Sequence, residues 1–182
     1  MSIDTDYHVL RRVLSEQEIS GWAIEFGVYT GYSIRIIAEH MPVIGLDSFA
    51  GLPEDWRPGF PKGKFDDKNS LRYLRAGPHP NIMLVGGLFE NTLPRLVEHG
   101  LPPLGLVHID CDLYSSTVTA LNGVLPFISP GTVFVFDEMK GYEGWEDHEA
   151  KAWSEFIDRH KVKGECIAWG AEEMAFRIES IG

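Results

Sequence analysis

Short, almost continuous apolar runs recur along the chain and alternate with longer amphipathic stretches. Parallel strands covered by helices on both faces give runs of this kind. The runs occupy 22–26, 42–46, 81–85, 104–109 and 132–136. Helical stretches between them occupy 31–40, 88–100 and 115–128. Strands that alternate with helices predict an α/β fold with a doubly wound, mostly parallel sheet.

The C-terminal part of the chain departs from this alternation. A helical pattern covers 145–160, and two alternating apolar runs follow at 164–170 and 172–178. Because only a short turn separates these two runs, they are predicted to pair as an antiparallel hairpin.

The remaining segments complete the predicted organisation. One helix is expected within residues 1–20. Residues 50–80 are rich in proline, glycine and charge, which predicts an irregular functional loop with one helix near 68–76. At this length the whole chain, 1–182, is expected to form a single domain.

Charge and hydropathy argue against two classes of partner. The formal net charge of −11 opposes binding to nucleic acid, which needs clustered Lys and Arg. No apolar run reaches the roughly 18 residues that a membrane helix needs. The N-terminus also lacks the basic and then apolar layout of a secretory signal. We therefore expect a cytoplasmic protein without nucleic-acid or membrane partners, and the sequence leaves its oligomeric state, including a homo-oligomer, open.

A glycine-bearing turn, EFGVYTG, follows the first apolar run. Gly27 and Gly31 lie where backbone amides and a helix N-terminus can approach a ligand. Asp47 ends the second run, where an acid binds ribose hydroxyls in nucleotide-binding α/β units. The turn lacks the G-x-G-x-x-G spacing of NAD and FAD sites, and Glu25 suits a cationic ligand, so S-adenosylmethionine fits best. Alternatively, the glycines only close a tight turn and Asp47 caps a loop.

Carboxylates follow the fourth and fifth predicted strands. Asp110 and, if the chain stays extended, Asp112 share one strand side with His108. Asp137 and Glu138 come at the same height after the fifth strand, beside the proposed nucleotide site. Carboxylates packed this closely repel one another unless a cation offsets their charge, and oxygen ligands suit Mg²⁺ or another hard divalent ion. Alternatively, the acids are helix caps and solvated loop residues, and His108 is a core residue.

Four segments, EFGVYTGYS, GLDSFAGLPE, HIDCDLYSST and PGTVFVFDE, resemble the macrocin O-methyltransferase family of class I S-adenosylmethionine-dependent methyltransferases in order and spacing. The resemblance runs from about residue 22 to the end of the chain. It implies a Rossmann-like, seven-stranded sheet with one antiparallel strand, a divalent cation and methyl transfer to hydroxyls of sugars and related natural products. The implied cofactor-binding residues are Glu25, Gly27, Val28, Gly31, Ser33, Asp47, Ser48 and Phe49. The implied metal ligands are Asp110, Asp137 and Glu138.

The predicted reaction is transfer of the sulfonium methyl group to a hydroxyl oxygen of a small-molecule acceptor. Asp112 is the first candidate for the base and His108 the second. Candidates for an acceptor-binding wall are the aromatic residues Trp56, Phe60, Tyr142 and Trp145.

Two other functions remain open at this stage. A metal-dependent hydrolase or phosphotransferase could use the same carboxylates, although it has no use for Glu25 or Asp47 and the chain has no P-loop lysine. A non-enzymatic small-molecule binding module or partner subunit could keep the same fold.

Overall fold

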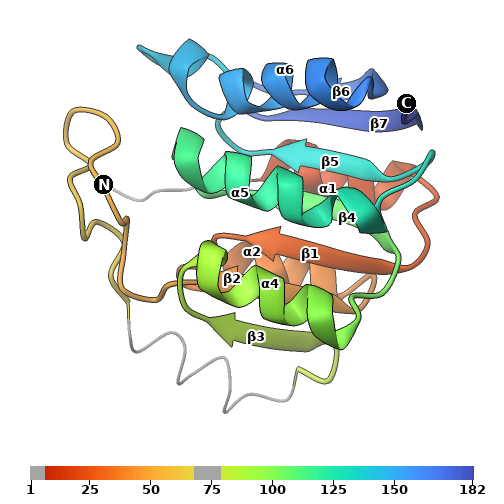
Figure 1. Ribbon diagram of the computed structural model, residues 1–182, viewed down its shortest axis with the longest axis horizontal. Helices are drawn as coiled ribbons and strands as arrows, with labels where there is room; N and C mark the ends of the chain where they lie inside the picture. Colours follow the sequence, from red (N-terminus) through yellow and green to blue (C-terminus); the bar gives the residue numbers. More distant parts are fainter. Residues whose placement is uncertain (1–6, 68–78) are drawn as a thin grey trace.

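The computed structural model describes residues 7–67 and 79–182, and its strands form one mixed sheet in the order β3-β2-β1-β4-β5-β7-β6 (Figure 1). The strands are β1 (Trp22–Phe26), β2 (Val43–Asp47), β3 (Ile82–Gly86), β4 (Leu104–Ile109), β5 (Val133–Phe136), β6 (Lys163–Trp169) and β7 (Met174–Ser180). The first five are parallel, and β7 runs antiparallel to both β5 and β6. The predicted α/β fold, with a mostly parallel seven-stranded sheet and a C-terminal antiparallel hairpin, is therefore confirmed.

Helices cover both faces of this sheet (Figure 1). They are α1 (His8–Glu16), α2 (Tyr32–Ala38), α4 (Phe89–His99), α5 (Tyr114–Val124) and α6 (Glu149–His160). Helices α4, α5 and α6 lie on one face, and α1 and α2 lie on the other. None of the helices in the described part of the chain is long and apolar enough to span a membrane.

The central strands explain why the apolar runs are continuous. In β5, Phe134 and Phe136 pack with Trp153 of α6, and their ring centroids lie 5.0 and 5.2 Å, respectively, from the centroid of the Trp153 ring. Val133 and Val135 of the same strand face the α1 and α2 side, because side chains alternate along a strand. Burying each of these side chains stabilises the fold by about 1.5–3 kcal/mol.

The observed helices differ from the predicted ones at their ends, most clearly in three cases. The helix predicted over 115–128 ends at Val124 and continues as a 3₁₀ turn, Leu125–Phe127, because Pro126 cannot donate a backbone hydrogen bond. The helix predicted over 145–160 begins at Glu149, after a separate 3₁₀ turn. Helix α1 occupies only part of the predicted segment 1–20.

The irregular segment lies near the C-terminal ends of the central strands (Figure 1). Residues 50–67 form turns and bends without a helix or strand, as predicted. The helix predicted near 68–76 lies outside the described residues. The parallel strands β1, β2, β4 and β5 point their C-terminal ends toward this loop, and Gly51, Leu52, Pro53 and Phe65 of the loop line the candidate site.

Candidate functional site

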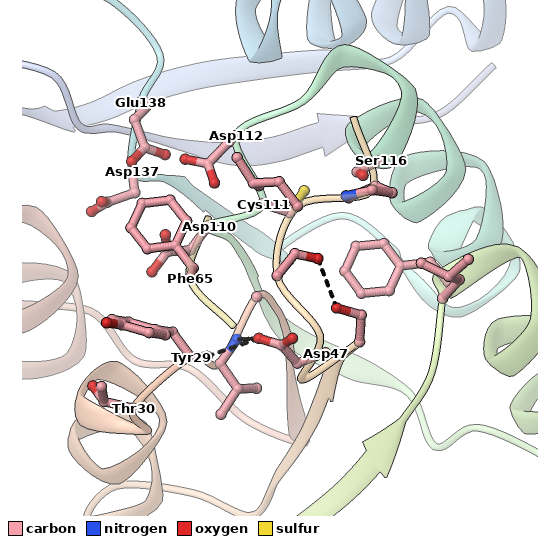
Figure 2. Close-up of a pocket in the computed structure, with 18 of the residues that line it drawn as sticks. Tyr29, Thr30, Asp47, Phe65, Asp110, Cys111, Asp112, Ser116, Asp137 and Glu138 are labelled. Carbon is pink, nitrogen blue, oxygen red and sulfur yellow. Dashed lines mark hydrogen bonds between the residues drawn. The ribbon is translucent and has the colours of Figure 1, made fainter. Parts of the chain in front are cut away.

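A cavity of about 310 Å³ lies at the C-terminal ends of β1, β2, β4 and β5 (Figure 2). Eight of the predicted site residues line it: Gly27, Val28, Asp47, Ser48, Asp110, Asp112, Asp137 and Glu138. Five others do not line it: Glu25, Gly31, Ser33, Phe49 and His108. The structure thus brings the predicted turn, the acid after β2 and the acidic strand ends into one site.

Gly27 allows the turn after β1 to pass directly against the end of β4. Its φ is +92°, and a Cβ atom at this position would lie 1.7 Å from the carbonyl oxygen of Asp110. The backbone around it is held by bonds from Gly27 N to Leu46 O and from Asp110 N to Phe26 O, both 2.9 Å. Any larger residue would clash with the backbone of Asp110. Glycine at this position therefore allows the predicted cofactor turn to contact the end of β4.

The carboxylate of Asp47 holds the same turn by hydrogen bonds. Its Oδ2 accepts hydrogen bonds from the backbone N–H groups of Val28 and Tyr29, both at 2.8 Å, and its Oδ1 accepts one from Phe49 at 2.6 Å. Each carboxylate oxygen can accept about two hydrogen bonds, so Oδ1 keeps room for one more donor. Asp47 can therefore shape the turn and still bind a ligand hydroxyl.

Glu25 and His108 form a buried pair that does not line the cavity. They lie opposite each other in the register of β1 and β4, and both are 0% exposed. His108 Nδ1–H donates to Glu25 Oε1 at 2.9 Å. Burial alone lowers the pKa of His108, but the hydrogen bond and charge of Glu25 outweigh it and raise that pKa above the usual value. Neither side chain lines the cavity, but the charges of both act on Asp110, which does.

The acidic strand ends form a compact cluster. Asp110, Asp137 and Glu138 each offer a carboxylate oxygen, and these oxygens lie within 4.8 Å of one another. Asp112 also lines the cavity, although its backbone is in the left-handed region, with φ of 63°, and does not extend the strand. Figure 2 shows the four carboxylates gathered on one side of the cavity.

Burial and mutual repulsion raise the pKa values of this cluster. Burial raises the pKa of Asp110 to about 6, and burial together with the charge of Asp110 raises the pKa of Asp112 to about 8. The same two causes raise the pKa of Asp137 well above its ordinary value. For Glu138, the causes are burial and Asp112, and its Oε2 is buried without a hydrogen-bond partner. Grouped oxygens that hold protons this tightly suit a hard divalent cation, which would replace the protons.

Two residues that the sequence did not indicate contact the acidic cluster. The hydroxyl of Tyr7 donates to Asp110 Oδ2 at 3.1 Å, and Tyr7 lines the cavity. Glu149, at the start of α6, is 0% exposed, and its Oε2 accepts from the backbone N–H of Glu138 at 3.2 Å. Glu149 lies in the first turn of the observed α6, but the sequence prediction began this helix at 145, and no local pattern marks Tyr7.

The aromatic residues proposed as an acceptor-binding wall lie elsewhere. Trp56, Phe60 and Tyr142 pack together, with centroid distances of 5.0 and 5.7 Å from the Trp56 ring, and none of the three lines the cavity. Trp145 is not a lining residue either. Phe65, in the same irregular loop, does line it. The sequence therefore indicated the right loop but not the aromatic side chain that reaches the cavity.

Solved structures with the same fold are methyltransferases. The calicheamicin methyltransferase CalS11 matches with a TM-score of 0.73 at 22% identity, covering 94% of this chain and 77% of that one. The O-methyltransferase NovP matches at 0.71 and 18%, covering 96% and 79%. An O-methyltransferase from Bacillus cereus, in complex with SAH, matches at 0.67 and 16%, covering 99% and 83%. At these identities the similarity shows the fold.

Sequence comparison supplies the family. No match was found among curated protein sequences. A family profile described as "Methyltransferase domain" matches residues 24–139, which is more than half of the chain. The matched segment contains the turn after β1, the loop beside the cavity and the acidic ends of β4 and β5. The chain therefore belongs to this family of methyltransferase domains.

Proposed function

We propose that this protein is a divalent-metal-dependent O-methyltransferase that moves a methyl group from S-adenosylmethionine to a hydroxyl of a sugar or glycosylated natural product. The main support for the proposal is that three carboxylates, those of Asp110, Asp137 and Glu138, lie together in one cavity. The turn that Asp47 holds by hydrogen bonds lines the same cavity. A hydrolase or phosphotransferase would need the acids but not this turn.

The proposed cofactor site comprises the turn after β1 and the end of β2. Asp47 Oδ1 keeps an acceptor position for a ribose hydroxyl, and the cavity wall beside it includes Val28 and Ser48. The negative charge of the cavity suits the sulfonium group of S-adenosylmethionine. The SAH bound to the Bacillus cereus enzyme of the same fold supports this assignment.

The proposed acceptor site lies beside the acidic cluster. Asp110, Asp137 and Glu138 would hold the cation, which, when bound, would lower the pKa of the acceptor hydroxyl and orient it. Asp112 lines the same cavity, and its pKa of about 8 suits a group that accepts a proton near neutral pH. The burial of His108 and its bond to Glu25 favour Asp112 for this role.

One known structure supports a sugar acceptor. CalS11 is described as a TDP-rhamnose 3'-O-methyltransferase of calicheamicin biosynthesis, whereas NovP is described as an O-methyltransferase and supports a hydroxyl acceptor. We infer a small-molecule acceptor for this chain from the shared fold and the concave cavity of about 310 Å³. The acidic lining of that cavity also opposes a nucleic-acid acceptor.

Thermal unfolding with added ligands tests the cofactor assignment. S-adenosylmethionine and S-adenosylhomocysteine should raise Tm, whereas NAD should not, because a ligand that binds only the folded state stabilises it by mass action. At 100 times Kd the stabilisation is about 2.7 kcal/mol. Each ligand is measured with and without Mg²⁺. The methyltransferase proposal fails if neither adenosyl ligand changes Tm.

A second measurement uses pH. The pKa values of Asp110 and Asp112, about 6 and about 8, exceed the ordinary aspartate value of 3.8. The metal-free folded protein therefore holds these protons more tightly than the unfolded chain, and its stability should fall as pH rises from about 4 through 8. Mg²⁺ competes with the same protons, so the increase in Tm that Mg²⁺ causes should grow over this range. An Mg²⁺ effect that stayed constant from pH 5 to 9 would contradict the assignment.

A further inference from the structure

A buried acid, Glu149, contacts the backbone of one proposed metal ligand. It is the first residue of α6, its side chain is 0% exposed, and it does not line the cavity. Its Oε2 accepts a hydrogen bond from the backbone N–H of Glu138 at 3.2 Å. Glu149 therefore acts on the acidic cluster through the backbone of a ligand residue.

The end of β5 explains why a side-chain acceptor is needed at this point. Buried backbone N–H groups require hydrogen-bond acceptors. The N–H of Asp137 donates to Ile109 O of β4 at 3.0 Å, and the two N–H groups that follow Glu138 both donate to Glu172 O, at 3.0 and 3.2 Å. The N–H of Glu138, between them, takes the carboxylate of Glu149 as its acceptor. The backbone that carries the ligand is thus held at each of these consecutive positions.

Helix α6 fixes the position of the Glu149 carboxylate. Ala152, Trp153 and Phe156 of the same helix are buried in the core that α6 forms with the sheet. The N-terminal turn of a helix also favours a negatively charged side chain. Because the helix is packed against the sheet, Glu149 can hold the backbone after β5 in one place.

The same carboxylate also interacts with the end of β4. Burial raises the pKa of Glu149 well above its ordinary value, and the backbone N–H groups of Glu138 and Cys111 partly offset this rise. Cys111 lies between Asp110 and Asp112 in the chain. In the described part of the chain, no group donates a hydrogen bond to Glu149 Oε1, so the bond to Glu138 is the one that fixes this side chain.

On the basis of the proposed function, we propose that Glu149 is a positioning residue for the cation. Its Oε2 holds the backbone of Glu138 so that the carboxylate of Glu138 joins the other two proposed ligands. The cation would contact Glu138 and not Glu149. This role requires an acceptor oxygen at the correct reach and does not require the charge of Glu149.

Two conservative variants separate reach from charge. Glu149→Gln keeps the side-chain length and an acceptor oxygen but loses the charge, whereas Glu149→Asp keeps the charge and is one methylene shorter. Mg²⁺ is titrated by calorimetry into the metal-free protein in the presence of SAH. Because residues that orient metal ligands typically change metal affinity 10–100-fold, the Kd of Mg²⁺ should rise at least 10-fold in Glu149→Asp and stay within about 3-fold of wild type in Glu149→Gln.

The affinity for SAH and a packing variant serve as controls. The Kd of SAH should be unchanged in both variants, because Glu149 forms none of the bonds that hold the turn after β1. Phe156→Leu changes a buried side chain of α6 that does not line the cavity. It should lower Tm and leave the Kd of Mg²⁺ unchanged. Equal weakening of Mg²⁺ binding by Phe156→Leu and Glu149→Asp would show loosening of the helix, and would overturn the role of Glu149.

The remaining outcomes distinguish this inference from the proposed function. Wild-type Mg²⁺ affinity in Glu149→Asp, or a loss in Glu149→Gln as large as that in Glu149→Asp, overturns the positioning role and leaves the proposed function standing. Glu149→Leu, which has no acceptor oxygen, replaces Glu149→Asp if that variant does not fold. Absence of Mg²⁺ binding by the wild-type protein would contradict the proposed metal dependence itself, and this inference with it.

Discussion

Gly27→Ala should destabilise the protein by on the order of 4 kcal/mol and abolish cofactor binding. The added Cβ would lie 1.7 Å from the carbonyl oxygen of Asp110, and that oxygen belongs to the backbone and cannot turn aside as a side chain could. The turn after β1 and the end of β4 would have to separate, which moves the amides of Val28 and Tyr29 away from Asp47. Thermal unfolding should show Tm lowered by roughly 10 °C, and calorimetry should show no SAH binding.

Gly131→Ala separates this clash from the cost of backbone strain. Gly131 has φ of +98°, close to the +92° of Gly27, but a Cβ there would meet no atom within 4 Å. Its replacement should cost only about 1 kcal/mol, the usual cost of placing a side chain in the left-handed region. SAH binding should be unchanged, because Gly131 lies outside the cavity. If the two variants lost the same stability, the close contact between Gly27 and Asp110 would not be the cause of the destabilisation.

The arrangement of the strands was largely predictable from the sequence. All seven strands give a recognisable pattern, because central strands covered on both faces are apolar throughout and the C-terminal pair alternates. The convergence of Asp110, Asp137 and Glu138 follows from the same reasoning, since neighbouring parallel strands end at one edge of the sheet. These predictions depend only on strand order along the chain and on strand direction.

Contacts that depend on register or on distant segments were not predictable. Glu25 and His108 meet because β1 and β4 align them, although 83 positions separate them in the sequence. Glu25 was expected to point toward the ligand, but in the structure it is 0% exposed and does not line the cavity. Tyr7 reaches Asp110 from the start of α1, where Val9 N donates to the carboxylate of Glu173 at 3.2 Å. No local pattern in the chain encodes either contact.

Asp137→Asn should abolish metal-dependent turnover while leaving the cofactor site intact. Asp137 is one of three carboxylates that would hold the cation, and it forms none of the bonds that fasten the turn after β1. Replacing a residue that only orients a metal ligand typically lowers metal affinity or activity 10–100-fold. Loss of a ligand itself should therefore reduce kcat/KM by more than roughly 100-fold. SAH affinity, measured by calorimetry, should be unchanged.

The same variant should make the metal-free protein more stable at pH 8. Burial and the charge of Asp110 raise the pKa of Asp137, so its ionised form is unfavourable in the folded state until a cation binds. Asn removes this repulsion, so Tm without metal should rise and the further increase that Mg²⁺ causes should disappear. Asp158→Asn, which neutralises an exposed acid on α6, should do neither. Full turnover by Asp137→Asn, or wild-type activity that persists in EDTA, would show that the acidic cluster does not bind a metal ion needed for activity.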